Sequence, residues 1–379
     1  MRRSRHDIRV ISLIRSIESW AHVARQLSLA LMRLGVRVGI EEHAERPADL
    51  DYQLPQALHE CIDPDIDADV DLAIVEPTEF GTVFRSRRRF ALMVWESSAW
   101  PVSWVAAARR ELHGVLVPSM FCARSLAAAG LPAWMITTVP HGVDSSVFHA
   151  RGRAPAGTRR RREILFVGTP AKRKGFDLLL TAFPRAFEPK GAPRLVLKTE
   201  DWPDRVDGYV RWRADVSALA AAGYDVHVIT ASLSDPQMAS LYSHADLLVL
   251  PHRGEGFGLP LIEAMACGTP VLSTAWSGPL DFVDESVGFQ LTEFEERAAR
   301  DLFPVRFEAP SDAVMVEPDL DALITTLRRV MATPEALAAK GRAAAQRAAL
   351  LTWHHSAFKT AAALGVKPSE HGRSRDLAR

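Results

Sequence analysis

The chain has 379 residues, of which 47% are hydrophobic and 24% are charged, and its formal net charge is zero. This composition is typical of a soluble globular protein, and the length favours two domains. A neutral chain has no bulk field that favours nucleic acid or a membrane surface, and no run of about 18 apolar residues predicts a membrane-spanning helix. The three cysteines are odd in number and widely spaced, which excludes a disulfide framework or zinc spacing and fits a cytoplasmic protein.

The first half of the chain alternates predicted strands with predicted helices. Residues 20–34 place apolar side chains on one helical stripe, and Gly35 is a suitable helix end. Ser119 can cap another helix that runs to Gly130. The strand–helix–strand order predicts a parallel sheet with right-handed crossovers. The predicted strands of this half are residues 8–14, 36–40, 72–75, 90–95, 115–117 and 135–139.

The same rhythm restarts after residues 150–163, which hold six arginines and no apolar periodicity and are predicted to be an interdomain linker. Ser234 and Gln237 match a capping box at a helix start. The predicted strands of this half are residues 164–167, 195–198, 226–229, 247–250 and 271–273. The predicted helices are residues 176–183, which Pro184 should stop, 261–267, 320–331 and 334–350.

Several charged runs are predicted to be solvated surface. Arg85–Arg89 and Arg159–Arg162 are basic, and each is interpreted as a solvated face or linker. Aspartates alternate along residues 63–71 and lead into a strand, which we interpret as a solvated acidic loop. No Asp-x-Asp pair stands in a suitable loop, so no metal site is expected.

The segment Asp246–Ser277, DLLVLPHRGEGFGLPLIEAMACGTPVLSTAWS, carries the strongest functional signal. A buried strand is followed by a loop with three glycines and by a helix that begins near Pro260. Free amide N–H groups at such a helix start favour an anion such as a phosphate. Glu255 and Glu263 are carboxylates that can accept the hydroxyls of a sugar. The alternative is that Glu263 only complements the helix dipole and that the glycines only form a turn.

Four segments of the chain, in order, resemble one family. Glu255 and Glu263 are separated by seven residues within EGFGLPLIEAMACGTPV, as in the signature of the retaining GT-B glycosyltransferases of family 4, the glycosyl transferases group 1. The other three segments resemble its interdomain stretch, its serine-led helix and the start of its nucleotide-binding domain. They are HGVDSSVF (141–148), VPSMFCARSLAAAG (117–130) and EILFVGTPAKRKGFDLLLTAF (163–183).

The resemblance implies an α/β protein of the GT-B class, with two Rossmann-like domains facing across a cleft. Residues 1–155 would form the N-terminal acceptor-binding domain, and residues 156–350 the C-terminal nucleotide-sugar-binding domain. Residues 351–366 would form a helix that crosses back to the first domain, and residues 367–379 a flexible tail.

The resemblance also implies roles for individual residues. In the family, the second signature glutamate, here Glu263, binds the ribose hydroxyls of the nucleotide, and the first, here Glu255, contacts the transferred sugar. The loop backbone meets the sugar and the phosphates, here at Gly256, Phe257, Gly258 and Leu259.

The chain departs from the family pattern at three places. Thr169 replaces the usual Arg of VGR…KG, so stabilisation of the leaving group is assigned to Lys174 and the adjacent Arg173. Ser16 lies in a loop where many members have a glycine pair. Glu96 lies where many have a histidine that faces the donor sugar, and it can replace that polar group.

Other residues near these motifs have structural interpretations, and two alternatives stay open for Trp95 and Glu96. Trp95 can stack on a sugar, or it is a core residue and Glu96 caps the next turn. His141 is predicted to shape the interdomain hinge and Asp144 to serve the same turn. Trp353 is predicted to be a packing anchor.

The predicted activity is that of a retaining glycosyltransferase that moves a sugar from a nucleotide-diphosphate sugar to an unidentified acceptor hydroxyl, with no cofactor and no metal. The expected partners are a nucleotide sugar and a glycan, lipid-linked or other acceptor, without nucleic acid; peripheral membrane contact is possible. One alternative is a non-catalytic glycan-binding or accessory partner of an active glycosyltransferase. Another is a nucleotide-sugar epimerase, against which the intact glutamate pair argues.

Overall fold

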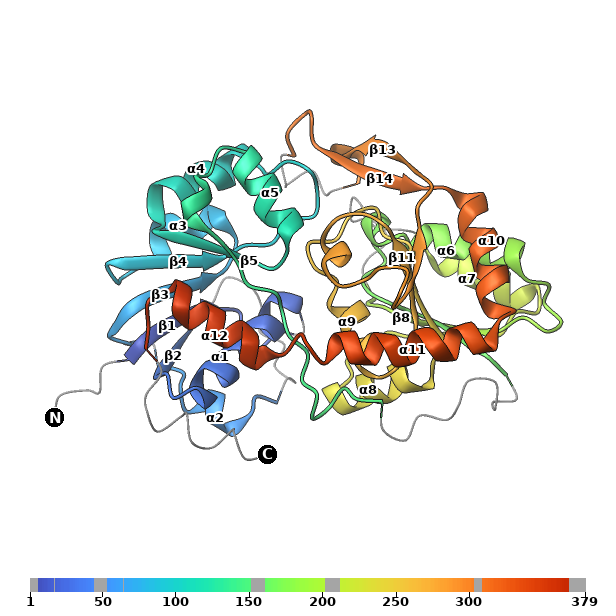
Figure 1. The fold of residues 1–379 in the computed structure, drawn as a ribbon, viewed down its shortest axis with the longest axis horizontal. Helices are drawn as coiled ribbons and strands as arrows, with labels where there is room; N and C mark the ends of the chain where they lie inside the picture. Colours follow the sequence, from blue (N-terminus) through green and yellow to red (C-terminus); the bar gives the residue numbers. More distant parts are fainter. Residues whose placement is uncertain are drawn as a thin grey trace. The chain divides into compact units, whose positions relative to one another are not determined.

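The computed structural model describes residues 6–16, 18–43, 53–63, 65–150, 161–201, 212–302 and 309–367. The chain forms two compact units, shown in Figure 1. The first unit comprises residues 1–95, 100–142 and 351–379, and the second comprises residues 96–99 and 143–350. The predicted boundary near residue 155 lies outside the described residues, and the units divide after Gly142.

The first unit is built on a six-stranded parallel sheet of order β2-β1-β3-β4-β5-β6. Its strands are β1 (His6–Ser12), β2 (Val38–Glu42), β3 (Ala68–Ile74), β4 (Arg88–Leu92), β5 (Gly114–Val117) and β6 (Ile136–Thr138). Its helices are α1 (Ser19–Arg33), α2 (Gln56–His59), α3 (Phe80–Val83), α4 (Val102–Glu111), α5 (Met120–Ala128) and α12 (Trp353–Ala363).

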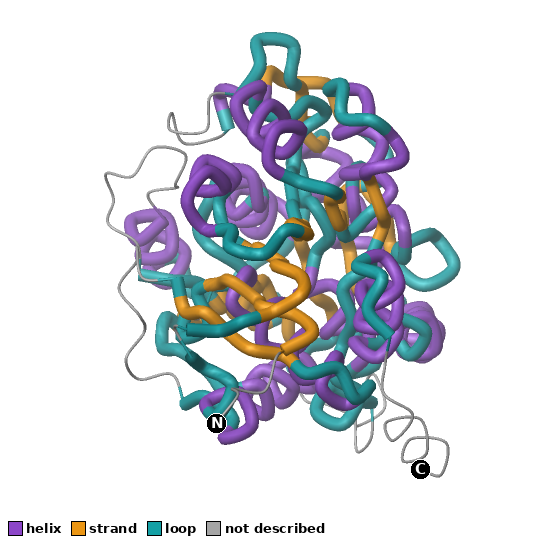
Figure 2. The backbone as a smooth tube through the Cα atoms, turned by 90° about the vertical axis from the view of Figure 1, so that its left-hand side faces the viewer, coloured by secondary structure: helices purple, strands orange, loops and turns teal. Residues whose placement is uncertain are grey.

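Helices cover the two faces of this sheet. Strand order reverses at β1, so right-handed crossovers place α1 on one face and α4 and α5 on the other. α12 lies along α1, as Figure 1 shows, and Figure 2 shows helices in purple flanking the strands in orange. Trp353 at the start of α12 is buried, and its ring lies 5.9 Å from that of His141. The prediction that Trp353 is a packing anchor is confirmed.

The second unit repeats this design with sheet order β12-β11-β10-β7-β8-β9, again all parallel. Its strands are β7 (Glu163–Val167), β8 (Arg194–Lys198), β9 (Val226–Ile229), β10 (Leu247–Leu250), β11 (Val271–Thr274) and β12 (Phe289–Leu291). Its helices are α6 (Phe176–Ala186), α7 (Trp212–Ala221), α8 (Asp235–His244), α9 (Leu259–Ala266), α10 (Leu320–Met331) and α11 (Pro334–Ala348). An antiparallel hairpin pairs β13 (Phe294–Ala298) with β14 (Val314–Pro318).

The prediction of two parallel α/β domains is confirmed, with two local corrections. α6 does not stop before Pro184 but continues to Ala186. The hairpin β13–β14 was not predicted, because the charged residues 295–297 hide the alternation of a strand. The capping box is present, since the Ser234 N–H donates to Gln237 Oε1 at 2.8 Å.

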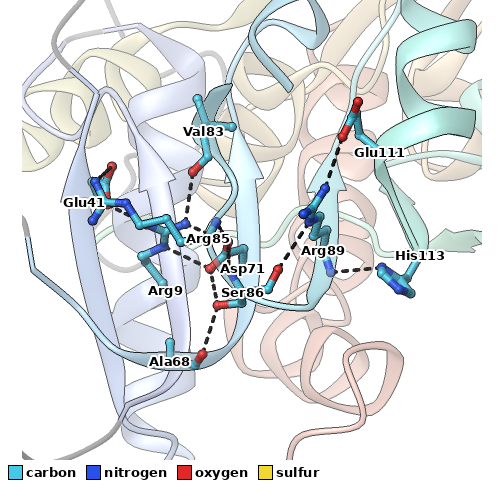
Figure 3. Close-up of polar contacts among 10 residues, drawn as sticks. All are labelled: Arg9, Glu41, Ala68, Asp71, Val83, Arg85, Ser86, Arg89, Glu111 and His113. Atoms are coloured by element: carbon cyan, nitrogen blue, oxygen red, sulfur yellow. Dashed lines mark hydrogen bonds and ion pairs between the residues drawn. The ribbon is translucent and has the colours of Figure 1, made fainter. Parts of the chain in front are cut away.

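A buried ion pair joins β1 to β3 in the first unit. Figure 3 shows Arg9 and Asp71 pointing toward each other, and both are fully buried. Arg9 Nε and Nη2 donate to the two Asp71 oxygens at 2.9 and 2.6 Å, and Arg9 Nη1 reaches Glu41 at 2.8 Å. Burial tends to raise the pKa of Asp71, but hydrogen bonds from Arg9 and Ser86 outweigh it and lower that pKa. Asp71 therefore belongs to the sheet and not to the predicted solvated acidic loop.

Asp71→Ala should lower the free energy of unfolding of the first unit by about 3–5 kcal/mol, because it leaves Arg9 charged and buried. Urea denaturation followed by tryptophan fluorescence measures this loss. Asp7→Ala is the control, because it breaks an ion pair whose Arg37 side chain is 58% exposed, and it should change stability little. Equal losses in the two variants would contradict the role given to the buried pair.

Candidate functional site

The strand order of the second unit indicates which edge of its sheet can bind a ligand. The order reverses between the neighbouring strands β7 and β10, so the loops that follow these strands leave toward opposite faces of the sheet. Open parallel sheets bind ligands beyond the carboxyl ends of their strands at such a reversal. The two loops are residues 168–175 and residues 251–258, and they hold most of the predicted site residues.

The two loops are in direct contact. Gly175 has a φ of 72°, and a Cβ atom at this position would collide with the Pro251 carbonyl. The Arg253 N–H donates to the Arg173 carbonyl at 2.8 Å, which ties the backbones together. The short 3-10 helix Lys172–Lys174 ends at this contact. The glycine after Lys174 is therefore required by the close approach of the second loop.

Arg253 is the residue that fixes the position of these loops, and sequence reasoning missed it. Its guanidinium donates to both oxygens of Asp177, at 2.7 and 2.9 Å, and to both oxygens of Glu317, at 2.8 and 2.6 Å. It also donates to the Lys172 carbonyl. Burial would lower its pKa, but the hydrogen bonds that it donates to these two carboxylates raise that pKa, so Arg253 stays charged.

Four charged residues predicted as catalytic come together at this edge. The Lys174 ammonium contacts Glu255 Oε1, and Arg173 Nη1 lies 3.4 Å from the same oxygen. Arg173 Nη2 lies 3.2 Å from Glu96 Oε1, so one guanidinium serves two carboxylates. Glu255 is only 5% exposed. The site therefore concentrates two cations around one buried carboxylate, with the second carboxylate at its rim.

The segment that carries Glu96 is held by the hairpin and by the glycine loop. The Ser98 N–H donates to the Val314 carbonyl at 3.0 Å, and the Val314 N–H donates to Ser98 Oγ at 2.9 Å. A Cβ atom on Gly254 would collide with the Glu96 carbonyl. Glu96 thus reaches Arg173 because residues 96–99 pack against the second unit. Trp95, in contrast, is buried beside Trp104 in the first unit, which supports the core reading over sugar stacking.

The two carboxylates on Arg173 have pKa values shifted in opposite directions. Burial raises the pKa of Glu255, but the charges of Lys174 and Arg173 outweigh it, so the net pKa is lowered. Burial raises the pKa of Glu96, and Arg173 only partly offsets this while Glu255 adds repulsion. Environments that separate two neighbouring pKa values are typical of sites that handle protons. Glu255 is therefore a stable anion, and Glu96 is the carboxyl that takes up a proton more readily.

Glu263 lies in the first turns of α9, beyond the glycine loop. Tyr242 Oη donates to Glu263 Oε2 at 2.7 Å. Burial raises the pKa of Glu263 to about 8, although the Tyr242 hydrogen bond opposes the shift, and the charge of Asp235 adds to it. Gly258 precedes the helix with a φ of 102°, a conformation that favours glycine.

The glycine loop is stabilised by a strained serine that the sequence did not reveal. Ser277 has a φ of 62° and is the one non-glycine residue with positive φ among the described residues. Its Oγ accepts the Glu255 N–H at 3.0 Å, and the Glu255 carbonyl accepts the Gly278 N–H at 2.9 Å. Strain of this kind concentrates at ligand sites. Phe257 is buried with its ring 5.0 Å from that of Phe282, so its side chain anchors the loop.

The remaining predicted residues are dispersed. Thr169 lies in the loop after β7, Gly256 in the glycine loop, and Leu259 is the first residue of α9. Ser16 belongs to the first unit, where its Oγ accepts the Glu18 N–H at 3.1 Å and its carbonyl accepts Arg25 Nη1 at 2.6 Å. Ser16 and the charged cluster belong to different units, and the role of Ser16 stays a prediction.

His252 is a further residue that the sequence did not single out. Its side chain is fully buried, and both ring nitrogens are without a hydrogen-bond partner among the residues described here. Burial lowers its pKa to about 4, and the charges of Glu255, Lys174 and Arg173 act on it. His252 is therefore a neutral imidazole next to the ionic cluster, which is formed by Glu96, Arg173, Lys174 and Glu255.

Within the described residues, no group of three or more His, Cys, Asp or Glu side chains is placed to hold a metal ion. In that part of the chain, no helix is both long enough and apolar enough to cross a bilayer.

Part of the second unit is similar to known proteins. Residues 153–302 match the family model of "Glycosyl transferases group 1", which covers the ionic cluster except Glu96. The D-inositol 3-phosphate glycosyltransferase of Segniliparus rotundus is 29% identical over 230 residues, which are 59% of this chain and 45% of that protein. The chain thus spans less than half the length of this curated relative.

Solved structures confirm the GT-B fold. Sucrose-phosphate synthase from Thermosynechococcus elongatus is 19% identical with a TM-score of 0.64, over 94% of this chain and 98% of that one. Anabaena HepE in complex with UDP-glucose is 14% identical with a TM-score of 0.67, over 95% of this chain and 100% of that one. At these identities the likeness establishes the fold.

Gly254→Ala should destabilise the protein by about 1–3 kcal/mol, because the added methyl group would overlap the Glu96 carbonyl and crowd Met315 and Trp276. Chemical denaturation measures the loss. Gly81→Ala is the matched control, because no atom lies within 4 Å of a Cβ built there. A loss for Gly254→Ala no larger than for Gly81→Ala would show that the loop and the Glu96 segment are not tightly packed.

Proposed function

From the match of residues 153–302 to glycosyl transferases group 1, we propose that this protein transfers a sugar, with retention of anomeric configuration, from a nucleotide-diphosphate sugar to an acceptor hydroxyl. The observation that carries the proposal is the buried Glu255 held between Lys174 and Arg173 at the reversal of the parallel sheet. Such a cluster supplies cations for a diphosphate and a carboxylate for sugar hydroxyls in one place.

Lys174 and Arg173 are assigned to the diphosphate. In glycosyl transfer the bond between the anomeric carbon and the diphosphate oxygen breaks, and negative charge grows on the leaving group. Cations already fixed near that oxygen lower the barrier without reorganising. The contact between the two loops and the Arg253 hydrogen bonds supply this rigidity, because they fix the backbone from which both cations extend.

Glu255 has a different role in the free and the bound protein. Without ligand it neutralises Lys174 and Arg173, which would otherwise be cations crowded at a buried edge. A bound diphosphate would share these cations, and Glu255 would then accept hydroxyl groups of the transferred sugar. Its lowered pKa keeps it ionised for this task at neutral pH.

Glu263 is assigned to the ribose hydroxyls, and the HepE structures solved with UDP and with UDP-glucose support a nucleotide-sugar ligand. The acceptor oxygen would form the new bond on the face from which the diphosphate leaves, and its proton would pass to a diphosphate oxygen. Glu96, at the rim of the cluster, is assigned to contact the donor sugar. The location is proposed to be cytoplasmic, where nucleotide sugars are the donors, and the transfer is proposed to need no metal.

A thermal-shift screen with UDP-glucose, GDP-mannose and ADP-glucose should identify the donor. A ligand present at about one hundred times its dissociation constant stabilises the native state by about 2.7 kcal/mol. We expect one of the three to raise the melting temperature, and release of the corresponding nucleoside diphosphate in the presence of soluble sugar acceptors. Binding without any release would favour the accessory-protein alternative over a transferase.

Lys174→Ala should weaken binding of the selected nucleotide sugar at least tenfold, which corresponds to about 1.4 kcal/mol, because it removes a cation from the diphosphate. Isothermal titration calorimetry measures the change. The neighbouring, exposed Lys172 provides the matched control, and Lys172→Ala should retain the native affinity. Unchanged affinity in Lys174→Ala would refute the assignment of this residue to the diphosphate.

A further inference from the structure

The side chain of Tyr242 is fixed before any ligand arrives. It extends from α8 toward α9 and is fully buried. Its ring lies 6.1 Å from that of Phe148, and its carbonyl accepts a hydrogen bond from Thr269 Oγ1 at 2.6 Å. From this position its hydroxyl donates to Glu263 Oε2 at 2.7 Å. Tyr242 therefore determines which way the Glu263 carboxyl points.

A carboxyl group recognises a vicinal diol best when both of its oxygens accept hydrogen bonds. An ionised carboxylate has about four acceptor positions, and the hydrogen bond from Tyr242 takes one of them. A protonated carboxyl loses part of this capacity because one oxygen becomes a donor. The proton on Glu263 therefore competes with a diol ligand.

In the free protein the surroundings of Glu263 favour the protonated form. Burial is the largest cause, and its pKa is raised to about 8. The hydrogen bond from Tyr242 favours ionisation of this carboxyl, and the charge of Asp235 in the first turn of α8 opposes it. Cys267 and Asp235 act in turn on Tyr242.

We propose that Tyr242 is a positioning residue for Glu263, and that a nucleotide sugar binds with release of the Glu263 proton to solvent, so that the carboxylate accepts both hydroxyls of the ligand's diol. This inference rests on the proposed function, since it takes the diol to be the ribose of the donor. The O–H bond of the carboxyl is the only covalent bond that breaks, and buffer takes up the proton.

The proposed release of the Glu263 proton predicts how the affinity for the nucleotide sugar changes with pH. Because the ionised form of Glu263 binds the ligand, affinity should rise as the pH increases from 6 toward the Glu263 pKa and level off above it, by up to tenfold for each pH unit. Tyr242→Phe removes a hydrogen bond that favours ionisation, so the rise should shift to higher pH. Glu263→Gln has no proton to lose, so its weaker binding should not follow this profile.

Calorimetry tests the proposal directly. The nucleotide sugar selected from UDP-glucose, GDP-mannose and ADP-glucose is titrated at pH 7 in phosphate and in Tris, whose ionisation enthalpies differ, so that the difference in binding heat counts released protons. Wild type should release close to one proton per ligand and Glu263→Gln none. Tyr224→Phe is the matched control, because it removes hydrogen bonds to the Pro184 and Phe187 carbonyls and should keep the wild-type profile.

The outcomes separate the two proposals. Binding to wild type without proton release would overturn the coupling while leaving the donor assignment intact, and this measurement does not depend on whether any variant folds. A Tyr242→Phe protein that folds and keeps the wild-type midpoint would overturn the role of Tyr242. Failure of all three nucleotide sugars to bind wild type would overturn the proposed function together with this inference.

Discussion

Arg253 carries a positive charge into a buried position, and two carboxylates and a carbonyl are arranged around it. A buried guanidinium that lost these partners would cost several kcal/mol, so the partners must hold their places. They come from α6, from β14 and from the loop after β7, which makes Arg253 the point where these elements are joined to the glycine loop. The spacing between Lys174 and Glu255 is a consequence of this arrangement.

Three carboxyl groups, from the glycine loop, from the segment 96–99 and from α9, lie in different electrostatic surroundings. Glu255 is stabilised as an anion by Lys174 and Arg173, the charges of the same two cations only partly offset the burial of Glu96, and the Glu263 carboxyl accepts a hydrogen bond from the Tyr242 hydroxyl. One edge of a sheet can therefore offer a permanent anion, a carboxyl that protonates readily and a carboxyl whose charge depends on the ligand. Burial alone would have raised all three pKa values, and the placement of Lys174 and Arg173 makes the difference.

Much of the fold could be predicted because the spacing of apolar residues and the residues that begin and end helices are local properties of the sequence. The strands 226–229 and 247–250 and the helix 320–331 were predicted with the observed bounds. The roles of three residues could not be predicted, because their partners are distant in the chain. The partner of Asp71 is 62 residues away, those of Arg253 are 64 to 81 residues away, and that of Tyr242 is 21 residues away. Pro184 misled the helix prediction, because α6 continues to Ala186 although the proline has no N–H to donate to the carbonyl of Leu180, and the Phe187 N–H still bonds to the Phe183 carbonyl. The glycine loop was recognisable in the sequence and is predicted to bind phosphate, whereas the strain at Ser277 left no signal in the sequence.

The closing helix α12 has a consequence for how the chain is made. It packs along α1 near the start of the sequence, and Gly142 lies so close to Trp353 that a Cβ atom there would overlap the backbone. The first unit is thus assembled from segments separated by more than two hundred residues. During synthesis on the ribosome, the second unit emerges and can fold before α12 has been made and can pack against the apolar face of α1. The first unit can therefore be completed only after the whole of the second unit has been synthesised.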